Sequence, residues 1–257
     1  MVGAVIGDII GSRFEKNNIK RKDFEFFTKE SIFTDDTVLT IAIADCILNS
    51  KDYEKTVKSY GRAYPFAGYG GTFKKWLAGI IKGPYNSWGN GSAMRVSPVG
   101  FAFEEEEKVL EEAKRSAEIT HNHIEGIKGA QAIAMAIFLS RKGKSKNEIK
   151  EYTEQKFGYD LNRTIDEIRP TYEFDVSCQG SVPESIIAFL ESENFEDAIR
   201  NAISIGGDSD TIASMTGAIS EAYYKSIPDE LIERMNEYLP KKFIKIIDDF
   251  SKKYDYN

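Results

Sequence analysis

Apolar residues recur at intervals of three and four positions along most of this chain, which is the spacing of helices that bury one face. One clear run extends from Val38 to Ile47, and a longer one, which predicts a buried helix, extends from Ile124 to Phe138. Further helices are predicted at residues 53–63, 107–118, 146–156, 161–168, 181–191, 194–204 and 211–225, and Pro228 and Pro240 should introduce two more. Convincing strand patterns of alternating apolar and polar residues are absent. The sequence therefore predicts an all-α fold.

The remaining segments are a glycine-rich start and two long connections. Gly3, Gly7 and Gly11 recur every four residues in the apolar segment 2–14, so on a helix they share one face that another helix can approach closely. Residues 16–33 are expected to be a loop. Residues 64–92 are too long for a structureless loop, so we expect a binding loop broken by short helices. Without repeats or a low-complexity linker, residues 1–257 are expected to form a single domain.

Composition narrows the classes of function. The formal net charge of −7 argues against a nucleic-acid partner, which would favour a basic face. The two cysteines, Cys46 and Cys178, form no metal-like pair and are typical of a reducing cytoplasm. The N-terminal segment lacks the basic start of a signal peptide, and no apolar stretch approaches the length of a membrane span. We expect a soluble, cytoplasmic protein without a membrane partner.

Two acidic clusters, each at a predicted helix start, carry the candidate chemistry. One is Thr34-Asp35-Asp36, and the other is the stretch from Ser204 to Ser214. That stretch holds Asp208 and Asp210, which can face one site only if the backbone is irregular, as glycine permits. Carboxylates gathered in a partly buried site repel one another unless cations balance them, and an all-oxygen set favours Mg²⁺ or Mn²⁺ over zinc. The alternative is two independent helix caps on separate faces.

A third dense region is Gly89-Asn90-Gly91-Ser92-Ala93-Met94-Arg95, where backbone amides at a helix start can cradle a phosphate. Aromatic residues nearby, Tyr69, Tyr85 and Trp88, can contact a base or ribose, although packing of an exposed turn explains them equally well. His121 and His123 are the only histidines, and a lone histidine is usually structural.

Five motifs in order resemble those of the ADP-ribosylglycohydrolase family over nearly the whole chain. They are Gly7-Asp8 with Phe14-Glu15, Thr34-Asp35-Asp36-Thr37, the segment from Gly89 to Arg95, Thr120-His121, and Gly206-Gly207-Asp208-Ser209-Asp210-Thr211. The resemblance implies a compact, orthogonal multi-helix domain with two Mg²⁺ (or Mn²⁺) ions at the base of an ADP-ribose cleft. By motif, the implied metal ligands are Thr34, Asp35, Asp36, Asp208, Asp210 and Thr211.

The resemblance also implies catalytic and substrate-binding roles. Glu15 matches an acidic residue beside the metals and, with Asp35 and Asp36, is a candidate catalytic carboxylate; which of them acts as general base stays open. The implied substrate-binding residues are Gly91, Ser92, Met94 and His121. The implied activity is hydrolysis of the glycosidic bond between ADP-ribose and a protein arginine or serine, or a small acceptor. A catalytically silent ADP-ribose-binding relative and a metal-dependent phosphoesterase are the alternatives.

Overall fold

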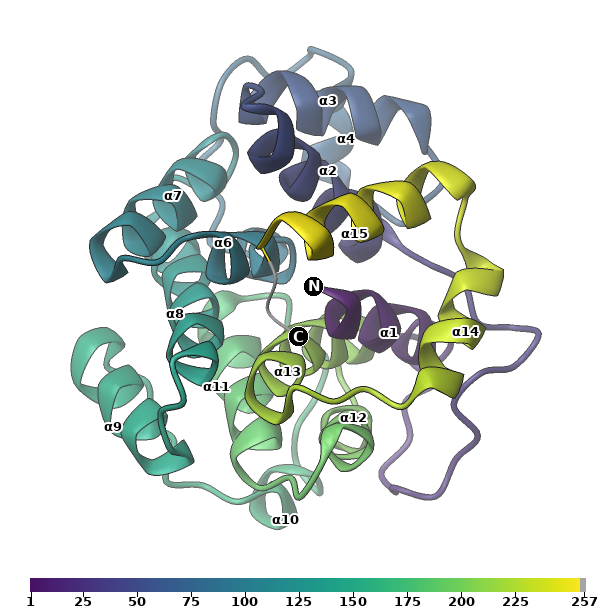
Figure 1. The fold of residues 1–257 in the computed structure, drawn as a ribbon, viewed down its shortest axis with the longest axis vertical. Coiled ribbons are helices and arrows are strands. Elements are labelled where there is room, and N and C mark those ends of the chain that lie inside the picture. The colour runs from purple at the N-terminus through teal and green to yellow at the C-terminus, as the bar shows by residue number, and fades with distance from the viewer. Residues whose placement is uncertain (255–257) are drawn as a thin grey trace.

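The computed structural model describes residues 1–254, whose regular elements are all helices, with one isolated β-bridge between Gly89 and Ser177 (Figure 1). The all-α prediction is confirmed. The helices are α1 (Val2–Gly11), α2 (Asp35–Asn49), α3 (Tyr53–Ala63), α4 (Gly71–Leu77), α5 (Gly91–Met94), α6 (Ser97–Ala102), α7 (Glu106–Glu118), α8 (Ile124–Arg141), α9 (Lys146–Phe157), α10 (Ile165–Ile168), α11 (Cys178–Leu190), α12 (Phe195–Ile205), α13 (Ser209–Tyr224), α14 (Asp229–Tyr238) and α15 (Lys241–Tyr254).

The longer predicted helices are present, and the differences concern short ones. Helix α10 covers only the second half of the predicted segment 161–168, because Thr164 begins it with a capping box that Glu167 completes. The helix start expected within Gly89–Arg95 is that of α5, whereas the extent of α5 and the presence of α6 were not predicted, since four and six residues are too few to show a periodic pattern. The loop expected at 16–33 contains no helix, and residues 64–92 contain α4, as a loop broken by short helices requires.

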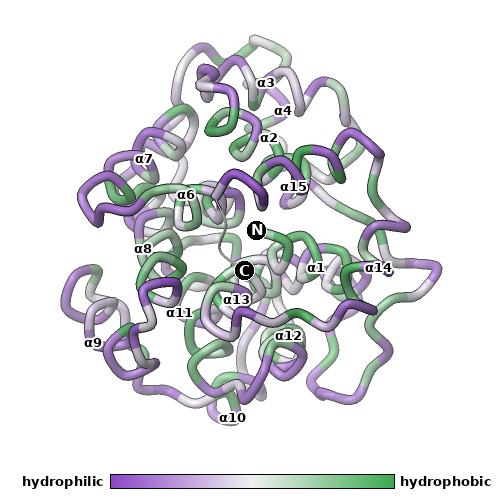
Figure 2. Tube along the Cα trace, viewed as in Figure 1, coloured by the Kyte–Doolittle hydropathy of each residue, from purple (hydrophilic) through white to green (hydrophobic). Residues whose placement is uncertain are grey.

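Helices α1 and α13 pack against each other in the middle of the molecule, with the other helices around them (Figure 1). Hydrophobic residues concentrate around this pair, and hydrophilic ones on the outer helices such as α7 and α9 (Figure 2). No described helix combines the length and the apolar character that crossing a bilayer requires.

The glycines of α1 set how closely these two helices approach, as their spacing predicts. A Cβ atom built on Gly3 would lie 2.2 Å from the carbonyl oxygen of Gly217, and one built on Gly7 would lie 2.1 Å from that of Ala213. One built on Gly11 would lie 2.5 Å from the Cα atom of Asp210. These distances exclude any side chain, so the close contact of α1 with the start of α13 depends on glycine. The contact places the last turn of α1 beside the acidic start of α13.

Candidate metal and substrate site

A cleft with a volume of about 420 Å³ lies where the starts of α2, α5 and α13 meet. Its walls combine the two acidic clusters with the glycine-rich segment before α5, although these are far apart in the sequence. Among the residues that line it are Glu15, Thr34, Asp35, Asp36, Gly89, Asn90, Gly91, Met94, Arg95, His121, Phe174, Val176, Asp208, Asp210 and Thr211. Of the predicted site residues, only Ser92 is absent from this lining.

The glycines before α13 turn its first acidic residues toward the cleft. Gly206 and Gly207 have φ angles of +77° and +72°, a conformation that favours glycine. Asn18 fixes this turn from the loop after α1, because its side chain accepts a hydrogen bond from the Gly207 amide at 2.7 Å and donates one to the Gly207 carbonyl at 2.9 Å. Asp208 is then held by a 2.7 Å hydrogen bond from Asn90 Nδ2. The turn therefore presents Asp208 and Asp210 to the same cavity.

The start of α2 is arranged by its own cap and by the loop before α4. Thr34 is the N-cap residue, and its hydroxyl accepts a hydrogen bond from the Asp36 amide at 3.3 Å. The amide of Asp35 donates to the carbonyl of Ala67 at 2.7 Å. Asp35 and Asp36 therefore begin a helix whose first amides favour negative charge.

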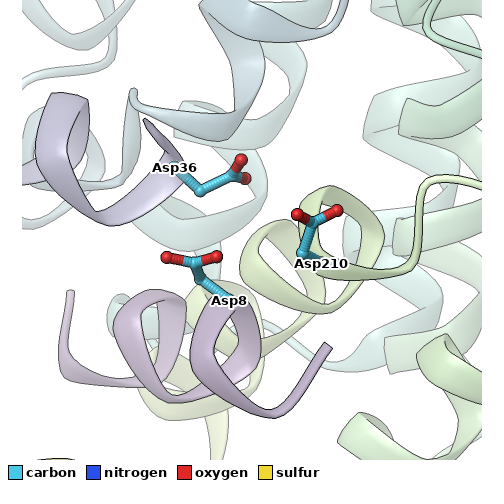
Figure 3. A group of neighbouring side chains, drawn as sticks. All are labelled: Asp8, Asp36 and Asp210. Carbon is cyan, nitrogen blue, oxygen red and sulfur yellow. The ribbon is translucent and has the colours of Figure 1, made fainter. Parts of the chain in front are cut away.

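Three buried carboxylates meet where Asp36 and Asp210 line the cleft, and the third, that of Asp8, is fully buried outside the lining (Figure 3). They belong to Asp8 on α1, Asp36 on α2 and Asp210 on α13, and one oxygen atom from each lies within 4.8 Å of the others. Asp36 is 2% exposed, and its Oδ1 atom has no hydrogen-bond partner among the described residues. Buried polar atoms in native proteins nearly always have a partner. A cation at this point would supply the one that Asp36 lacks.

Asp8 is the residue of this cluster that the candidate site residues named from the sequence do not include. Its Oδ2 atom accepts hydrogen bonds from the amides of Thr34 (2.9 Å) and Thr37 (3.1 Å) and from the Thr37 hydroxyl, and its Oδ1 atom accepts one from the Thr34 hydroxyl at 2.7 Å. The side chain thus ties α1 to the first turn of α2. The available signal was an aspartate inside an otherwise apolar helix, since a buried charge needs partners.

Burial raises the pKa of each carboxyl group in this cluster. Burial and then the charge of Asp8 raise the pKa of Asp35 to about 8 and that of Asp36 well above its usual range. Burial, followed by the charges of Asp36 and Asp208, does the same to Asp210. Burial also raises the pKa of Asp8 and Asp208, although their hydrogen bonds oppose it. So many ionised carboxylates are compatible with one site only if positive charge balances them.

This set of donors, which are all oxygen atoms, therefore fits Mg²⁺ or Mn²⁺. The negative charge of the carboxylates is uncompensated, and more than one such cation fits it. Thr211 contributes a further oxygen, and its hydroxyl lies 3.3 Å from Asp36 Oδ2 as a hydrogen-bond donor. Half-buried Glu15 lines the same cavity from the loop after α1.

The predicted substrate-binding residues are divided between the cleft and the core. Gly91, Met94 and His121 line the cleft, whereas Ser92 is fully buried and its hydroxyl donates to the Gly126 carbonyl at 2.7 Å. The Ser92 side chain therefore anchors α5 to α8 and does not reach the cavity. Of the aromatic candidates, Tyr85 lines the cleft, but Tyr69 is buried outside its lining.

The far rim of the cleft is apolar. Phe174 and Val176 line it although they are 54% and 44% exposed, and neither was a candidate from the sequence. They lie in a helix-free segment before α11, where no periodic pattern marks them.

Comparison with known proteins shows the family of this chain. The sequence model of the ADP-ribosylglycohydrolase family matches residues 1–256. The chain belongs to the ADP-ribosylglycohydrolase family. Family membership makes it an enzyme that hydrolyses glycosidic bonds.

This ADP-ribosylglycohydrolase has relatives in animals and bacteria. It is 26% identical to the ADP-ribosylhydrolase ARH3 of Gallus gallus over 307 aligned positions, which cover 87% of this chain and 84% of that protein. The corresponding Homo sapiens protein is also 26% identical, over 306 positions with 87% and 84% covered. The ADP-ribosylarginine hydrolase Tri1 of Pseudomonas putida is 23% identical, with 91% and 72% covered.

The fold of this ADP-ribosylglycohydrolase matches a solved structure described as an "ADP-ribosylglycohydrolase-related protein complex". The TM-score is 0.76 at 21% identity, with 98% of this chain and 95% of that chain covered. The alignment with the Gallus gallus protein is longer than this whole chain of 257 residues, so that relative carries residues inserted within the aligned region.

Proposed function

We propose that this ADP-ribosylglycohydrolase uses two Mg²⁺ (or Mn²⁺) ions to hydrolyse the bond between ADP-ribose and a protein arginine or serine side chain, or a small acceptor. The observation that carries the proposal is the buried acidic cluster at the base of the cleft, with Asp36 Oδ1 left without a partner. We also propose that residues 1–257 act as one domain, in the cytoplasm, on ADP-ribosylated protein or a small ADP-ribose conjugate.

The ions would be held by oxygen atoms from the two helix starts, and Asp8 would hold the α2 start in place. The proposed ligands are Thr34, Asp35, Asp36, Asp208, Asp210 and Thr211. When bound, the ions would balance the carboxylate charge and supply a Lewis acid. Asp8 already accepts hydrogen bonds from four donors, so an orienting role suits it better than a ligand role.

The side chains around the cluster would carry out the remaining steps. Attack of a water molecule on the anomeric carbon forms a new C–O bond, breaks the bond to the acceptor group and releases a proton from the water. Glu15, Asp35 or Asp36 accepts this proton, and the departing acceptor nitrogen or oxygen takes one up. Positive charge that develops on the sugar is stabilised by the same carboxylates. Gly91 and Met94 shape the wall against which ADP-ribose would lie, with His121 beside them.

Incubation of the purified protein with ADP-ribosyl-arginine, ADP-ribosyl-serine and a small ADP-ribose conjugate, in Mg²⁺ or Mn²⁺, tests the proposal. Free ADP-ribose, measured by mass spectrometry, should be released from at least one of them. Asp36→Asn should lower the rate at least 100-fold, within the range for removing a catalytic proton acceptor. Asp23→Asn, which changes an exposed loop aspartate, is the matched control and should retain the rate.

Two other outcomes would contradict the proposal. Binding of ADP-ribose without release from any substrate would indicate a silent ADP-ribose-binding relative. Release of inorganic phosphate from nucleotides, without release of ADP-ribose, would indicate a phosphoesterase.

A further inference from the structure

Arg95 at the end of α5 is a buried cation without an anionic partner. Its side chain is fully buried, and it forms no ion pair with a carboxylate of residues 1–254. Only Nη2 is used, as a donor to the Ser116 carbonyl and to the Thr120 hydroxyl, both at 2.9 Å. Nε and Nη1 have no partner in the described chain. Burying a charge this way is costly, which indicates a task beyond packing.

The guanidinium group is held at one end of a helix. Ser116 lies in the last turn of α7, and Thr120 follows two residues after that helix ends. Carbonyl groups at a helix C-terminus attract cations, so this end of α7 offsets part of the cost of burying Arg95. The result is a fixed donor aimed at the Thr120 oxygen.

Thr120 connects this fixed donor to the neighbouring histidine through a hydrogen bond. Its Oγ1 atom lies 2.7 Å from His121 Nδ1. A guanidinium group can only donate, so Thr120 Oγ1 accepts from Arg95 and has its own hydrogen available for His121. The Thr120 oxygen keeps a second lone pair, so this contact by itself fits either tautomer; the positive charge of Arg95 beside it favours the one in which Nδ1 accepts and Nε2 carries the hydrogen.

The Nε2 atom of His121 lies on the cleft side of this chain of hydrogen bonds. A Cβ atom built on Gly91 would lie 3.1 Å from it, and one built on Gly89 would lie 3.7 Å away. Both glycines line the cleft, and Nε2 has no hydrogen-bond partner among residues 1–254. We propose that Arg95, acting through Thr120, is a positioning residue that holds His121 in the Nε2–H tautomer and directs this N–H group into the cleft.

The electrostatics of the pair agree with this arrangement. Burial, followed by the charge of Arg95, keeps the pKa of His121 well below its usual range. Burial lowers the pKa of Arg95 to about 10, so it stays charged at neutral pH, and raises that of the neighbouring Tyr85 to about 12. Arg95 is thus the charged group that faces His121, and it disfavours a hydrogen on the near nitrogen, Nδ1. Resting on the proposed function, this N–H would donate to an oxygen atom of ADP-ribose.

Nuclear magnetic resonance can read the tautomer directly, because the chain has only two histidines. His123→Asn removes the other one, and asparagine can replace its capping of the Glu125 amide at the start of α8. In this background, long-range ¹H–¹⁵N correlation spectra should show a neutral His121 with its hydrogen on Nε2 from pH 5.5 to 8. A hydrogen on Nδ1, or a protonated ring at pH 6, would overturn the proposal.

Variants then test whether the chain of hydrogen bonds causes this state. Thr120→Val removes the hydroxyl with little change in shape and should populate both tautomers, whereas Thr120→Ser should restore Nε2–H. Arg95→Met removes both the hydrogen-bond donor and the positive charge, and it should raise the pKa of His121. Thr120→Val interrupts the link between Arg95 and His121 while the buried cation stays in place. A Thr120→Val protein that keeps pure Nε2–H would overturn the proposal.

Calorimetry with ADP-ribose separates this inference from the proposed function. Thr120→Val should weaken ADP-ribose binding about twofold, because the apparent affinity scales with the fraction of rings in the Nε2–H form, and Thr120→Ser should recover most of it. His123→Asn should bind like the unmodified protein. Equal affinity of the valine and serine variants would contradict a role of the tautomer in binding. If the unmodified protein does not bind ADP-ribose, the proposed function fails, while the spectra still decide the tautomer.

Discussion

The stability of the metal-free protein should fall as the pH rises, in contrast to proteins whose carboxylates are paired. A carboxyl group with a raised pKa binds its proton more tightly in the folded than in the unfolded chain. The stability that such a group contributes is therefore fully present below its pKa in the unfolded chain, near 4. It is lost progressively as the pH rises, until the pH exceeds the pKa of the group in the folded chain. For Asp35, whose pKa is raised to about 8, this window extends from about pH 4 to about pH 8.

The structure sets the size of the effect. One group that is protonated only in the folded state changes the free energy of unfolding by about 1.4 kcal/mol per pH unit. Between pH 5 and pH 7, one such group lowers stability by about 3 kcal/mol, or about 6–12 °C in melting temperature for a chain of this size. Burial raises the pKa of Asp8, Asp36, Asp208 and Asp210 as well, which adds to this loss, whereas the lowered pKa values of His121 and of the N-terminal amine oppose part of it.

Asp36→Asn should reduce this slope by up to about 1.4 kcal/mol per pH unit and make the metal-free protein more stable at pH 8. The new amide can donate to a neighbouring carboxylate, where the carboxylate of Asp36 repels it. Divalent cations should reverse the order of stability of the two proteins, because ions at 100 times their dissociation constant add about 2.7 kcal/mol to the stability of a protein that binds them. The Asp36→Asn protein should gain less stability from the same ions.

Thermal and urea denaturation with EDTA, and with Mn²⁺, at pH 5 to 8 measure these differences, with Asp23→Asn as the control for loss of an exposed charge. A metal-free stability that is constant or rises over this range would refute the reasoning. So would an Asp36→Asn protein that is less stable than the unmodified one in EDTA at pH 8.

Two glycine substitutions test the packing and the cleft. Gly7→Ala places a methyl group 2.1 Å from the Ala213 carbonyl oxygen and should destabilise the protein by about 1–3 kcal/mol or more in urea denaturation, whereas Gly71→Ala, with nothing within 4 Å, should be neutral or slightly stabilising. Equal midpoints of urea denaturation for the Gly7→Ala and Gly71→Ala proteins would contradict the close contact between α1 and α13. Gly91→Ala brings a methyl group 3.1 Å from His121 Nε2 and should weaken ADP-ribose binding in calorimetry without lowering the melting temperature; unchanged affinity would place the ligand elsewhere.

The fold could be predicted largely because helices leave a local periodic signal. The close approach of α1 to another helix could also be predicted, because the spacing of its three glycines places them on one helix face. The extent of α5 and the presence of α6 could not, because each helix is shorter than two turns.

The site was predictable where a single stretch carries it and unpredictable where distant segments share it. Asp208 and Asp210 stand out in the sequence beside two glycines. The role of Asp8, in contrast, is apparent only from the hydrogen bonds that it accepts from Thr34 and Thr37. The arrangement around His121 depends on a buried side chain, Arg95, whose partners follow the end of another helix. Ser92 shows the reverse case. It lies within a motif that resembles a ligand-binding segment, and yet its hydroxyl bonds to the backbone of α8.

The central claim is that the acidic cluster holds divalent cations, and the number of Mn²⁺ ions bound per chain tests it most directly. Equilibrium dialysis followed by elemental analysis should find two ions per chain in the unmodified protein at neutral pH and fewer in Asp36→Asn, with Asp23→Asn unchanged. A protein that binds no Mn²⁺ or Mg²⁺ at millimolar concentration, or an Asp36→Asn variant that binds as many ions as the unmodified chain, would contradict the account.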